Sequence, residues 1–126
     1  MAEHLLEGLR ILVVEDEYLI ADDMRDVLLD AGADVLGPVP NVAAAASLVA
    51  AESRVDAALL DINLGGTMVF EFADTLKARA VPFAFATGYD SSAIPDRFAE
   101  VPRLEKPVKA RSVLAVLEPL LKRDAV

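Results

Sequence analysis

The sequence contains no cysteine among its 126 residues. This absence excludes a disulfide framework, a thiolate metal site and a thiol nucleophile. No stretch approaches the ~18 consecutive apolar residues that a membrane-spanning helix requires. The first residues, 1–4, include an acid and lack the pattern of a signal peptide. We therefore expect a cytoplasmic protein that does not bind a membrane.

Positive charge and histidine are both scarce. The 12 Lys and Arg residues are outnumbered by 21 Asp and Glu residues, so the formal net charge is −9. Affinity for nucleic acid comes largely from cationic contacts to phosphates, and we therefore expect no nucleic-acid partner. The single histidine, His4, lies near the N-terminus and is expected to be solvated rather than to act in phosphotransfer.

The composition is that of a globular protein. Hydrophobic residues make up 55% of the chain and charged residues 26%, which differs from the composition of disordered chains. A chain of this length buries roughly two thirds of its unfolded surface when it folds. We therefore predict a single domain over residues 1–126.

Five short runs are predicted to be strands, four of them apolar and the last, at Arg103-Leu104, only brief. The runs at 9–14 and 57–61 are almost continuously apolar, as in strands that are covered on both faces of a sheet. The other three runs cover residues 35–36, 82–86 and 103–104. The 57–61 run ends abruptly in a carboxylate, Asp61, and Asn63 follows two residues later.

Segments with helical periodicity separate these runs. They cover residues 20–31, 41–51, 67–76 and 110–121. The segment 90–100 stays open between helix and loop, because Pro95 limits a helix there. Asn41 and Thr67 are expected N-caps, and Pro119 is expected to kink or shorten the last helix. Strands that alternate with helices predict a doubly wound α/β fold, with a five-stranded parallel sheet between helices on both faces.

Polar side chains follow four of the five runs. The carboxyl ends of parallel strands meet at one edge of a sheet, where open sheets bind ligands. The residues placed there are Glu15, Asp16, Asp61, Thr87, Gly88 and Lys106. Taken alone, each has an ordinary explanation: an acid can start a helix or a turn, a threonine can end a strand, and a lysine can be a solvated surface charge.

Together, these residues suit phosphoryl transfer to a carboxylate. Clustered carboxylates repel one another and need a cation, and oxygen ligands favour a hard ion such as Mg²⁺, or Mn²⁺. A carboxylate can act as the nucleophile and form an aspartyl phosphate. A lysine and a hydroxyl can share the charge of the phosphoryl oxygens, and Gly88 leaves room for the group.

This combination resembles the receiver domain of two-component response regulators over residues 8–123. The matching motifs are Glu15-Asp16, Asp61-Ile62-Asn63, Thr87-Gly88 and Lys106-Pro107. The resemblance implies a flavodoxin-like strand order, 2-1-3-4-5. It also implies that Asp61 accepts a phosphoryl group from a sensor histidine kinase or a histidine phosphotransfer protein.

The resemblance further implies a role for each acidic residue of the site. Asp16 and Asp61 would ligate the metal directly, together with the backbone carbonyl of Asn63. Glu15 would act mainly through water. The acceptor would therefore also be a metal ligand.

The remaining residues of the motifs would contact the phosphoryl group or shape the site. Thr87, Gly88 and Lys106 would lie at the phosphoryl oxygens. Pro107 would shape the turn that follows the lysine, through the cis peptide bond that is typical of the family.

The sequence departs from the usual receiver pattern at two positions. Receivers usually carry an aromatic switch residue three positions before the lysine, where this chain has Arg103, and many carry proline four positions after the acceptor, where it has Gly65. The run 82–89 instead resembles the receiver subgroup that is named for its Phe-Ala-Thr-Gly-Tyr motif and is associated with alphaproteobacterial signalling. These departures leave phosphorylation intact but argue against the usual switching relay.

We therefore expect a stand-alone switch whose phosphorylation changes partner binding, and not an enzyme. Tyr89 follows Thr87 by two residues, and Gly88 between them is permissive in its backbone angles. Our hypothesis is that phosphorylation reorders Tyr89 and residues 90–100. The downstream partner would then bind the face formed by the fourth helix, the fifth strand and the fifth helix of the expected fold.

Two other functions are compatible with this fold class. A small Mg²⁺-dependent phosphatase with an aspartyl-phosphate intermediate usually needs a further general acid near the nucleophile, but Asn63 cannot titrate. An FMN-binding module would need a phosphate-cradling loop after the first strand, where the three acids of residues 15–17 would repel the phosphate. Turnover of a phosphomonoester would favour the first alternative, and flavin absorbance the second.

Overall fold

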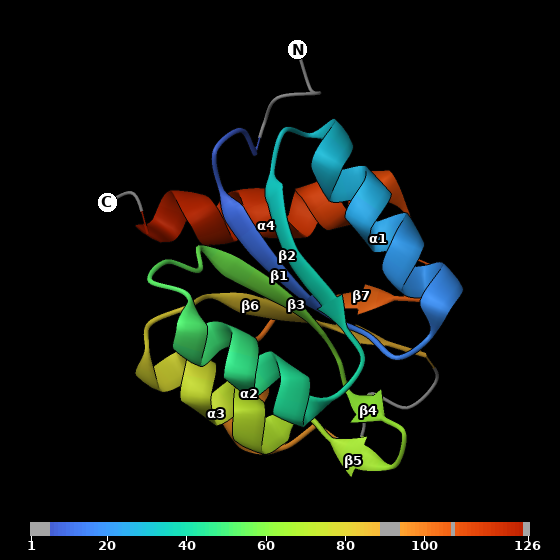
Figure 1. The fold of residues 1–126 in the computed structure, drawn as a ribbon, viewed down its shortest axis with the longest axis vertical. Coiled ribbons are helices and arrows are strands. Elements are labelled where there is room, and N and C mark those ends of the chain that lie inside the picture. Colours follow the sequence, from blue (N-terminus) through green and yellow to red (C-terminus); the bar gives the residue numbers. More distant parts are fainter. Residues whose placement is uncertain (1–5, 89–93, 107, 125–126) are drawn as a thin grey trace.

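The sheet that the sequence predicts is present, with the predicted strand order. The computed structural model describes residues 6–88, 94–106 and 108–124 (Figure 1). All five strands of the main sheet run parallel, in the order β2 (Asp34–Val39), β1 (Arg10–Val14), β3 (Ala57–Asp61), β6 (Phe83–Thr87) and β7 (Arg103–Glu105). This is the order 2-1-3-4-5 of the predicted flavodoxin-like fold.

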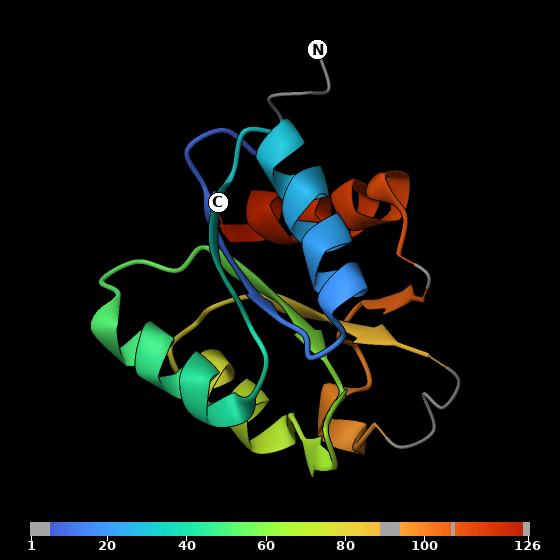
Figure 2. The ribbon, with the colours of Figure 1, turned by 45° about the vertical axis from the view of Figure 1, so that its right-hand side comes forward.

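Helices cover both faces of this sheet, as Figures 1 and 2 show from two directions. On one face lie α1 (Tyr18–Asp30) and α4 (Ala110–Asp124). On the other face lie α2 (Val42–Ala51) and α3 (Phe70–Ala78). Each face has its own hydrophobic core, because successive side chains of a strand point to opposite faces. The described residues contain no helix with the length and hydropathy of a membrane span.

The central strands explain why the apolar runs are so regular. Every residue of β3 and of β6 is buried, because each strand has a neighbour on both sides and helices above and below. Asp61 and Thr87 are the last residues of these two strands and are themselves buried, at 5% and 7% exposure. The strands therefore carry two polar side chains to the same edge of the sheet.

Strand β2 is longer than predicted. The sequence predicts a strand that ends before Gly37-Pro38, but the strand continues through both residues to Val39. Gly37 has a φ of +94°, and a Cβ there would lie 2.8 Å from the backbone nitrogen of Val39 and 3.0 Å from Val13 O. Glycine is therefore required at this position. The proline is tolerated because β2 is an edge strand and needs fewer backbone donors.

The segment after Asp61 forms a small hairpin rather than the start of a helix. Strands β4 (Asn63–Leu64) and β5 (Thr67–Met68) pair antiparallel, and Gly65 and Gly66 both have positive φ. The prediction that Thr67 caps a helix was wrong, since Thr67 belongs to β5 and Val69 precedes α3. By contrast, the predicted cap at Asn41 is confirmed, because its side chain accepts a hydrogen bond of 2.8 Å from Ala44 N.

The fourth helix of the expected fold is only a single 3-10 turn in its described part. The turn η3 covers Asp96–Phe98 and begins after Pro95, while residues 89–93 lie outside the described residues. Phe98 anchors this turn because its fully buried ring lies 5.6 Å from the ring of Phe85. The turn is held by this buried side chain and by backbone hydrogen bonds of the 3-10 type, such as that of 2.9 Å from Phe98 N to the carbonyl of Pro95.

Pro119 does not shorten the last helix. Helix α4 extends from Ala110 to Asp124 and contains the proline in its interior. Pro119 lies on the exposed side of the helix, where water can replace the hydrogen bond that a proline removes. The predicted shortening was therefore wrong.

Candidate functional site

Three carboxylates meet at the carboxyl edge of the sheet. Glu15 directly follows β1, Asp16 comes next, and Asp61 ends β3, which pairs with β1. One carboxylate oxygen of each of the three residues lies within 4.8 Å of the others. Glu15 and Asp61 are buried, whereas Asp16 is exposed at the opening of the cluster. The structure thus brings together Glu15, Asp16 and Asp61, which the sequence placed at the same edge of the sheet.

Lys106 supplies the positive charge of the cluster. It follows β7, and its backbone N–H donates a hydrogen bond of 2.9 Å to the carbonyl of Thr87. Its Nζ lies 3.1 Å from Glu15 Oε1 and 3.2 Å from Asp61 Oδ1. One ammonium group therefore lies between two buried carboxylates and neutralises only part of their charge.

The electrostatics of Glu15 show that the cluster has too little positive charge. Burial, followed by the nearby charge of Asp61, raises the pKa of Glu15 to about 7, although Lys106 acts in the opposite direction. Glu15 Oε1 is buried and has no hydrogen bond of good geometry, although the lysine ammonium is within ion-pair distance. The ionised form of this side chain therefore needs a further positive group.

The pKa values of the other two groups follow from the same balance. Burial raises the pKa of Asp61, and the attraction of Lys106 offsets this only in part. Burial by itself would lower the pKa of Lys106, but the charges of Glu15 and Asp61 outweigh it and raise that pKa overall. The lysine is therefore charged throughout the physiological range, while the acids share one neutralising group.

Thr87 and Gly88 border the cluster on the side of β6. Thr87 is the final residue of β6, and the register places Asp61 opposite its neighbour Ala86. Gly88 is exposed, and a Cβ at this position would meet no atom within 4 Å. Open space therefore lies next to the buried Thr87.

Four predicted residues remain, and the structure describes two of them, Asn63 and Arg103. Asn63 is exposed in β4, and its side chain accepts a hydrogen bond of 2.8 Å from Gly66 N, which helps to fix the hairpin. Arg103 is the exposed first residue of β7, opposite Phe85 in the register. Tyr89 and Pro107 lie outside the described residues.

Two residues near the cluster, Glu17 and Gly65, were not among the predicted site residues. Glu17 Oε1 lies 3.6 Å from Lys106 Nζ, and Glu17 N donates a hydrogen bond of 3.1 Å to Glu15 Oε2. Gly65 approaches Asp16, since a Cβ there would lie 3.9 Å from Asp16 Oδ2. The acidic run of residues 15–17 signalled the first contact, but nothing in the sequence signalled the second.

The donor set fits a divalent cation. Three carboxylate oxygens converge, one each from Glu15, Asp16 and Asp61. Glu15 also has a buried oxygen, Oε1, that makes no hydrogen bond of good geometry. Hard oxygen ligands of this kind suit Mg²⁺, which keeps several waters in its shell. The exposed position of Asp16 leaves room for such waters.

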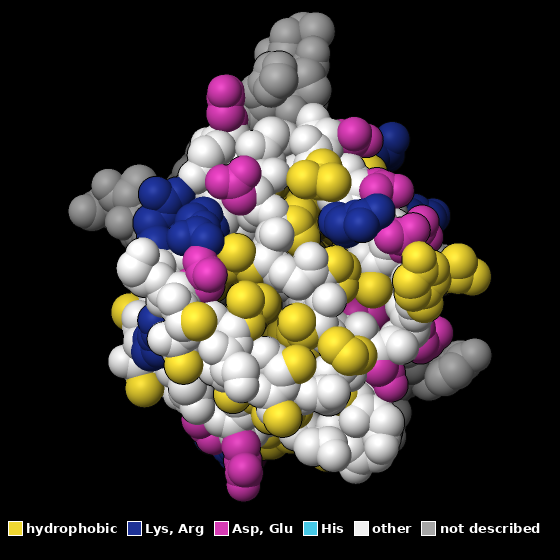
Figure 3. Space-filling model, viewed as in Figure 1, with side chains coloured by type: hydrophobic (Ala, Val, Ile, Leu, Met, Phe, Trp, Pro, Cys, Tyr) yellow, Lys and Arg dark blue, Asp and Glu magenta, His cyan; other side chains and the backbone are white. Residues whose placement is uncertain are grey.

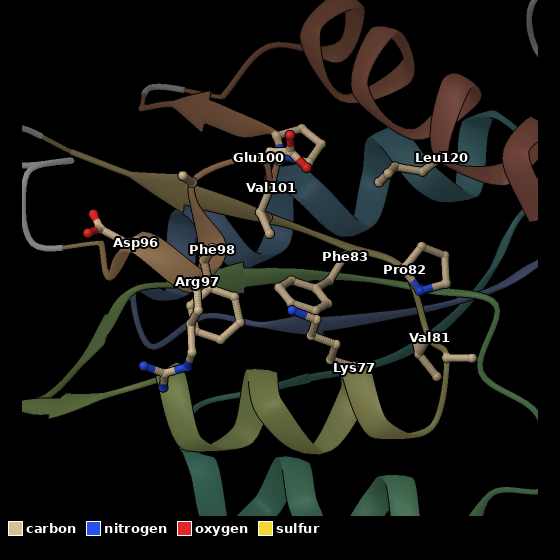
Figure 4. Close-up of a pocket in the computed structure, with 13 residues that line it drawn as sticks. Lys77, Val81, Pro82, Phe83, Asp96, Arg97, Phe98, Glu100, Val101 and Leu120 are labelled. Carbon is tan, nitrogen blue, oxygen red and sulfur yellow. The ribbon is translucent and has the colours of Figure 1, made fainter.

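A separate cavity of about 680 Å³ lies away from the acid cluster. Figure 4 shows that its lining comes from the end of α3, the η3 turn and the segments that lead into β6 and β7, with Leu120 of α4. Phe83 and Phe98 form much of its apolar wall. None of the three clustered carboxylates lines this cavity.

The fold and the cluster together define a flavodoxin-like α/β domain with an acidic site at the carboxyl edge of its sheet. Comparison with protein-family models and with curated proteins gave no match, but comparison with solved structures gave many. The chain is 40% identical to SdrG from Sphingomonas melonis Fr1, with a TM-score of 0.81, and the match covers 93% of this chain and 98% of SdrG.

Two further structures agree with this match. The BeF3-activated conformation of SdrG from Pseudomonas melonis Fr1 is 36% identical, with a TM-score of 0.76 and coverage of 96% and 99% of the two chains. The signal receiver domain of a modulated diguanylate cyclase from Desulfovibrio desulfuricans G20 is 33% identical, with a TM-score of 0.75 and coverage of 92% and 95%. The chain belongs to the response regulator receiver domains. These matches do not favour the phosphatase alternative.

Proposed function

We propose that this receiver accepts a phosphoryl group on Asp61 and changes its partner binding as a result. The observation that carries the proposal is the contact of Lys106 Nζ with Asp61 Oδ1 at 3.2 Å, inside a cluster of three carboxylates at the carboxyl edge of the sheet. This arrangement holds a carboxylate nucleophile beside a fixed positive charge. The relationship to an SdrG whose structure is known in a BeF3-activated conformation supports it.

The residues of the chain would share the work of the transfer. An Asp61 oxygen attacks the phosphorus atom, and the bond from phosphorus to the donor histidine nitrogen breaks, so that the nitrogen keeps the electron pair. Lys106 then offers its ammonium to a phosphoryl oxygen, and Thr87 offers its hydroxyl to another. The open space at Gly88 admits the group.

Asp16 and Asp61, with the Asn63 backbone carbonyl, would hold Mg²⁺ directly, and Glu15 would contact its waters. The bound ion would neutralise charge that the transferred group brings into the cluster. The raised pKa of Glu15, to about 7, is consistent with this, because the cluster with Lys106 alone favours protonation. We therefore propose that phosphorylation requires a divalent cation.

The output surface would include η3, β7 and α4. Arg103 in β7 is exposed and has no aromatic ring that could move between two positions. The conformational change on phosphorylation must therefore involve other side chains. Phe85 lies two residues before Thr87 on the same face of β6, and its ring contacts Phe98 of η3. A shift of Thr87 towards a phosphoryl group would therefore be transmitted through Phe85 and Phe98 to η3. We propose that Tyr89 is also part of the segment that rearranges.

We further propose that the chain belongs to the receiver subgroup with the Phe-Ala-Thr-Gly-Tyr motif. Its residues 85–89 read Phe-Ala-Thr-Gly-Tyr, and the exposed Arg103 at the usual aromatic position agrees with a different relay. In this view the partner upstream is a histidine kinase or a histidine phosphotransfer protein.

The function can be tested by phosphotransfer from a purified kinase. A ³²P-labelled histidine kinase from the source organism should pass its label to this chain in the presence of Mg²⁺, and Asp61→Asn should receive none. Asp56→Asn is the matched control, since Asp56 lies in the loop before β3 at the opposite end of that strand. Equal labelling of Asp61→Asn and the control would contradict the proposal.

A further inference from the structure

Glu17 occupies the N-cap position of α1 but does not cap the helix. Its backbone is extended, with φ −88° and ψ 111°, and its side chain makes no capping hydrogen bond. The side chain of an N-cap residue usually accepts a hydrogen bond from one of the free backbone N–H groups of the first turn. An acid at the start of a helix is ordinary by itself, so the informative feature is the direction of this side chain.

The Glu17 carboxylate points towards the acid cluster instead. Its Oε1 lies 3.6 Å from Lys106 Nζ, and its backbone N–H donates a hydrogen bond of 3.1 Å to Glu15 Oε2. The side chain of Glu17 is 62% exposed, whereas that of Lys106 is 12% exposed. Glu17 therefore contacts the lysine from the solvent side, from which a phosphodonor has to arrive.

Lys106 does not depend on Glu17 for its position. Its Nζ lies closer to Glu15 Oε1, at 3.1 Å, and to Asp61 Oδ1, at 3.2 Å. Glu17 thus adds a third carboxylate to a single ammonium group. Its charge makes the approach to Asp61 more negative and is not needed to hold the lysine.

The surface around this approach is acidic as well. The chain has a net charge of −9, and Asp and Glu side chains gather along α1 and near its N-terminal end, on the right of Figure 3. Fixed negative charge lowers the local concentration of anions. Among the exposed acids that the structure describes, Glu17 is the one within ion-pair distance of Lys106.

We propose that Glu17 is a specificity-determining residue that selects phosphodonors by their charge. The inference rests on the proposed function, since it concerns transfer to Asp61. The Glu17 carboxylate repels each negative charge of a donor, so a doubly negative acyl phosphate is disfavoured more strongly than a singly negative N-phosphoryl donor. A phosphorylated histidine whose ring carries a proton belongs to the second class.

The transfer itself follows the same course with both classes of donor. An Asp61 oxygen bonds to phosphorus, and the bond from phosphorus to the donor oxygen or nitrogen breaks, with its electron pair left on the donor. Glu17 takes no part in these bond changes. It acts through its charge on the arriving donor and through its competition with the phosphoryl oxygens for Lys106.

Phosphorylation of Glu17→Gln by two small donors tests the proposal, because this substitution keeps the size of the side chain and removes its charge. Acetyl phosphate is doubly negative at neutral pH. With this donor and Mg²⁺, the second-order rate constant should rise about 3- to 10-fold over the wild type at low ionic strength. Phosphoramidate is singly negative, and its rate constant should rise only about 2- to 3-fold. In about 1 M NaCl, both differences should shrink below ~2-fold.

Glu100→Gln is the matched control. It removes the same charge from an exposed residue in the segment before β7, at the opposite edge of the sheet from the acid cluster. Its rate constants with both donors should stay within about 1.5-fold of the wild type, since charges separated by more than a Debye length are largely screened.

Three outcomes would overturn the inference while Asp61 is still labelled. Slower labelling of Glu17→Gln would show that Glu17 positions Lys106. Equal gains with the two donors, or a gain that persists in about 1 M NaCl, would show that the charge of Glu17 does not select the donor. The proposed function fails differently: a wild type that forms no acyl phosphate with either donor would overturn that function and the inference with it.

Discussion

The ammonium of Lys106 lies 3.2 Å from Asp61 Oδ1, so the lysine contacts the proposed acceptor in a structure without a phosphoryl group. The same group also lies 3.1 Å from Glu15 Oε1. A lysine held by two carboxylates is positioned in advance, and phosphorylation only needs to redirect it to a new anionic oxygen. This contact determines several of the properties that can be measured.

Replacing the lysine should slow phosphorylation without unfolding the chain. Lys106→Met keeps the length of the side chain but removes the charge, which leaves the phosphoryl oxygens less stabilised. We expect the rate of labelling by a small phosphodonor to fall about 10- to 100-fold. Lys109→Met changes an exposed lysine three residues further on and should leave the rate unchanged. Similar rates in the two variants would contradict the role of Lys106.

Mg²⁺ should stabilise the folded chain through the three carboxylates. At a concentration tenfold above its Kd, an ion that binds only the folded state raises the free energy of unfolding by about 1.4 kcal/mol. Asp16→Asn removes one ligand and should reduce this gain, whereas Asp23→Asn on the exposed side of α1 should keep it. Urea unfolding with and without Mg²⁺ measures the difference. An equal gain in both variants would place the ion elsewhere.

Stability should also depend on pH through Glu15. Its pKa is about 7 in the folded chain, compared with 4.5 for an unperturbed group, so between these values the folded state binds more protons than the unfolded state. In the absence of metal, the free energy of unfolding should therefore fall as the pH rises from about 4.5 to about 7. Glu15→Gln cannot ionise, so its curve should lack this part of the decline, which is on the order of 3 kcal/mol.

Mg²⁺ provides the control for that experiment. A bound cation favours the ionised form of Glu15, so saturating Mg²⁺ should flatten the decline in the wild type. The other acids titrate in both proteins, and only the difference between wild type and Glu15→Gln is informative. Parallel curves for the two proteins without metal would mean that the pKa of Glu15 is not raised.

The turn η3 should depend on one aromatic side chain. Phe98 is fully buried and packs against Phe85 and Phe70, so Phe98→Ala should lower the free energy of unfolding by about 3–5 kcal/mol. Its neighbour Arg97 pairs with Asp74 in the solvent, and Arg97→Ala should change stability little. A small effect of Phe98→Ala in urea unfolding would show that η3 is not anchored by this ring.

The sequence predicts those parts of the structure that follow from periodicity. The runs that contain Asp61 and Thr87 are apolar on both faces and lie beside each other in the sheet, so their ends had to meet. The same reasoning placed Glu15 and Lys106 at that edge. No part of this required knowledge of the turns.

Turns and tertiary contacts were harder to predict. The β4–β5 hairpin depends on the left-handed conformations of Gly65 and Gly66, whereas Thr67 by itself is a good helix cap. The η3 turn depends on the burial of the Phe98 ring, and its sequence neighbours do not indicate this packing. The structural role of a glycine pair or of an isolated aromatic residue depends on contacts with residues that are distant in the sequence. The periodicity of the sequence does not show these contacts.

The central claim is that Asp61 is the acceptor, and peptide-level mass spectrometry tests it most directly. After incubation with acetyl phosphate and Mg²⁺, followed by reduction of acyl phosphates with sodium borohydride, the wild type should carry one modified residue, Asp61. Asp61→Asn should carry none, and Asp56→Asn should be modified as the wild type is. Modification of Asp16 or Glu15 in the wild type, or an acyl phosphate in Asp61→Asn, would contradict the account.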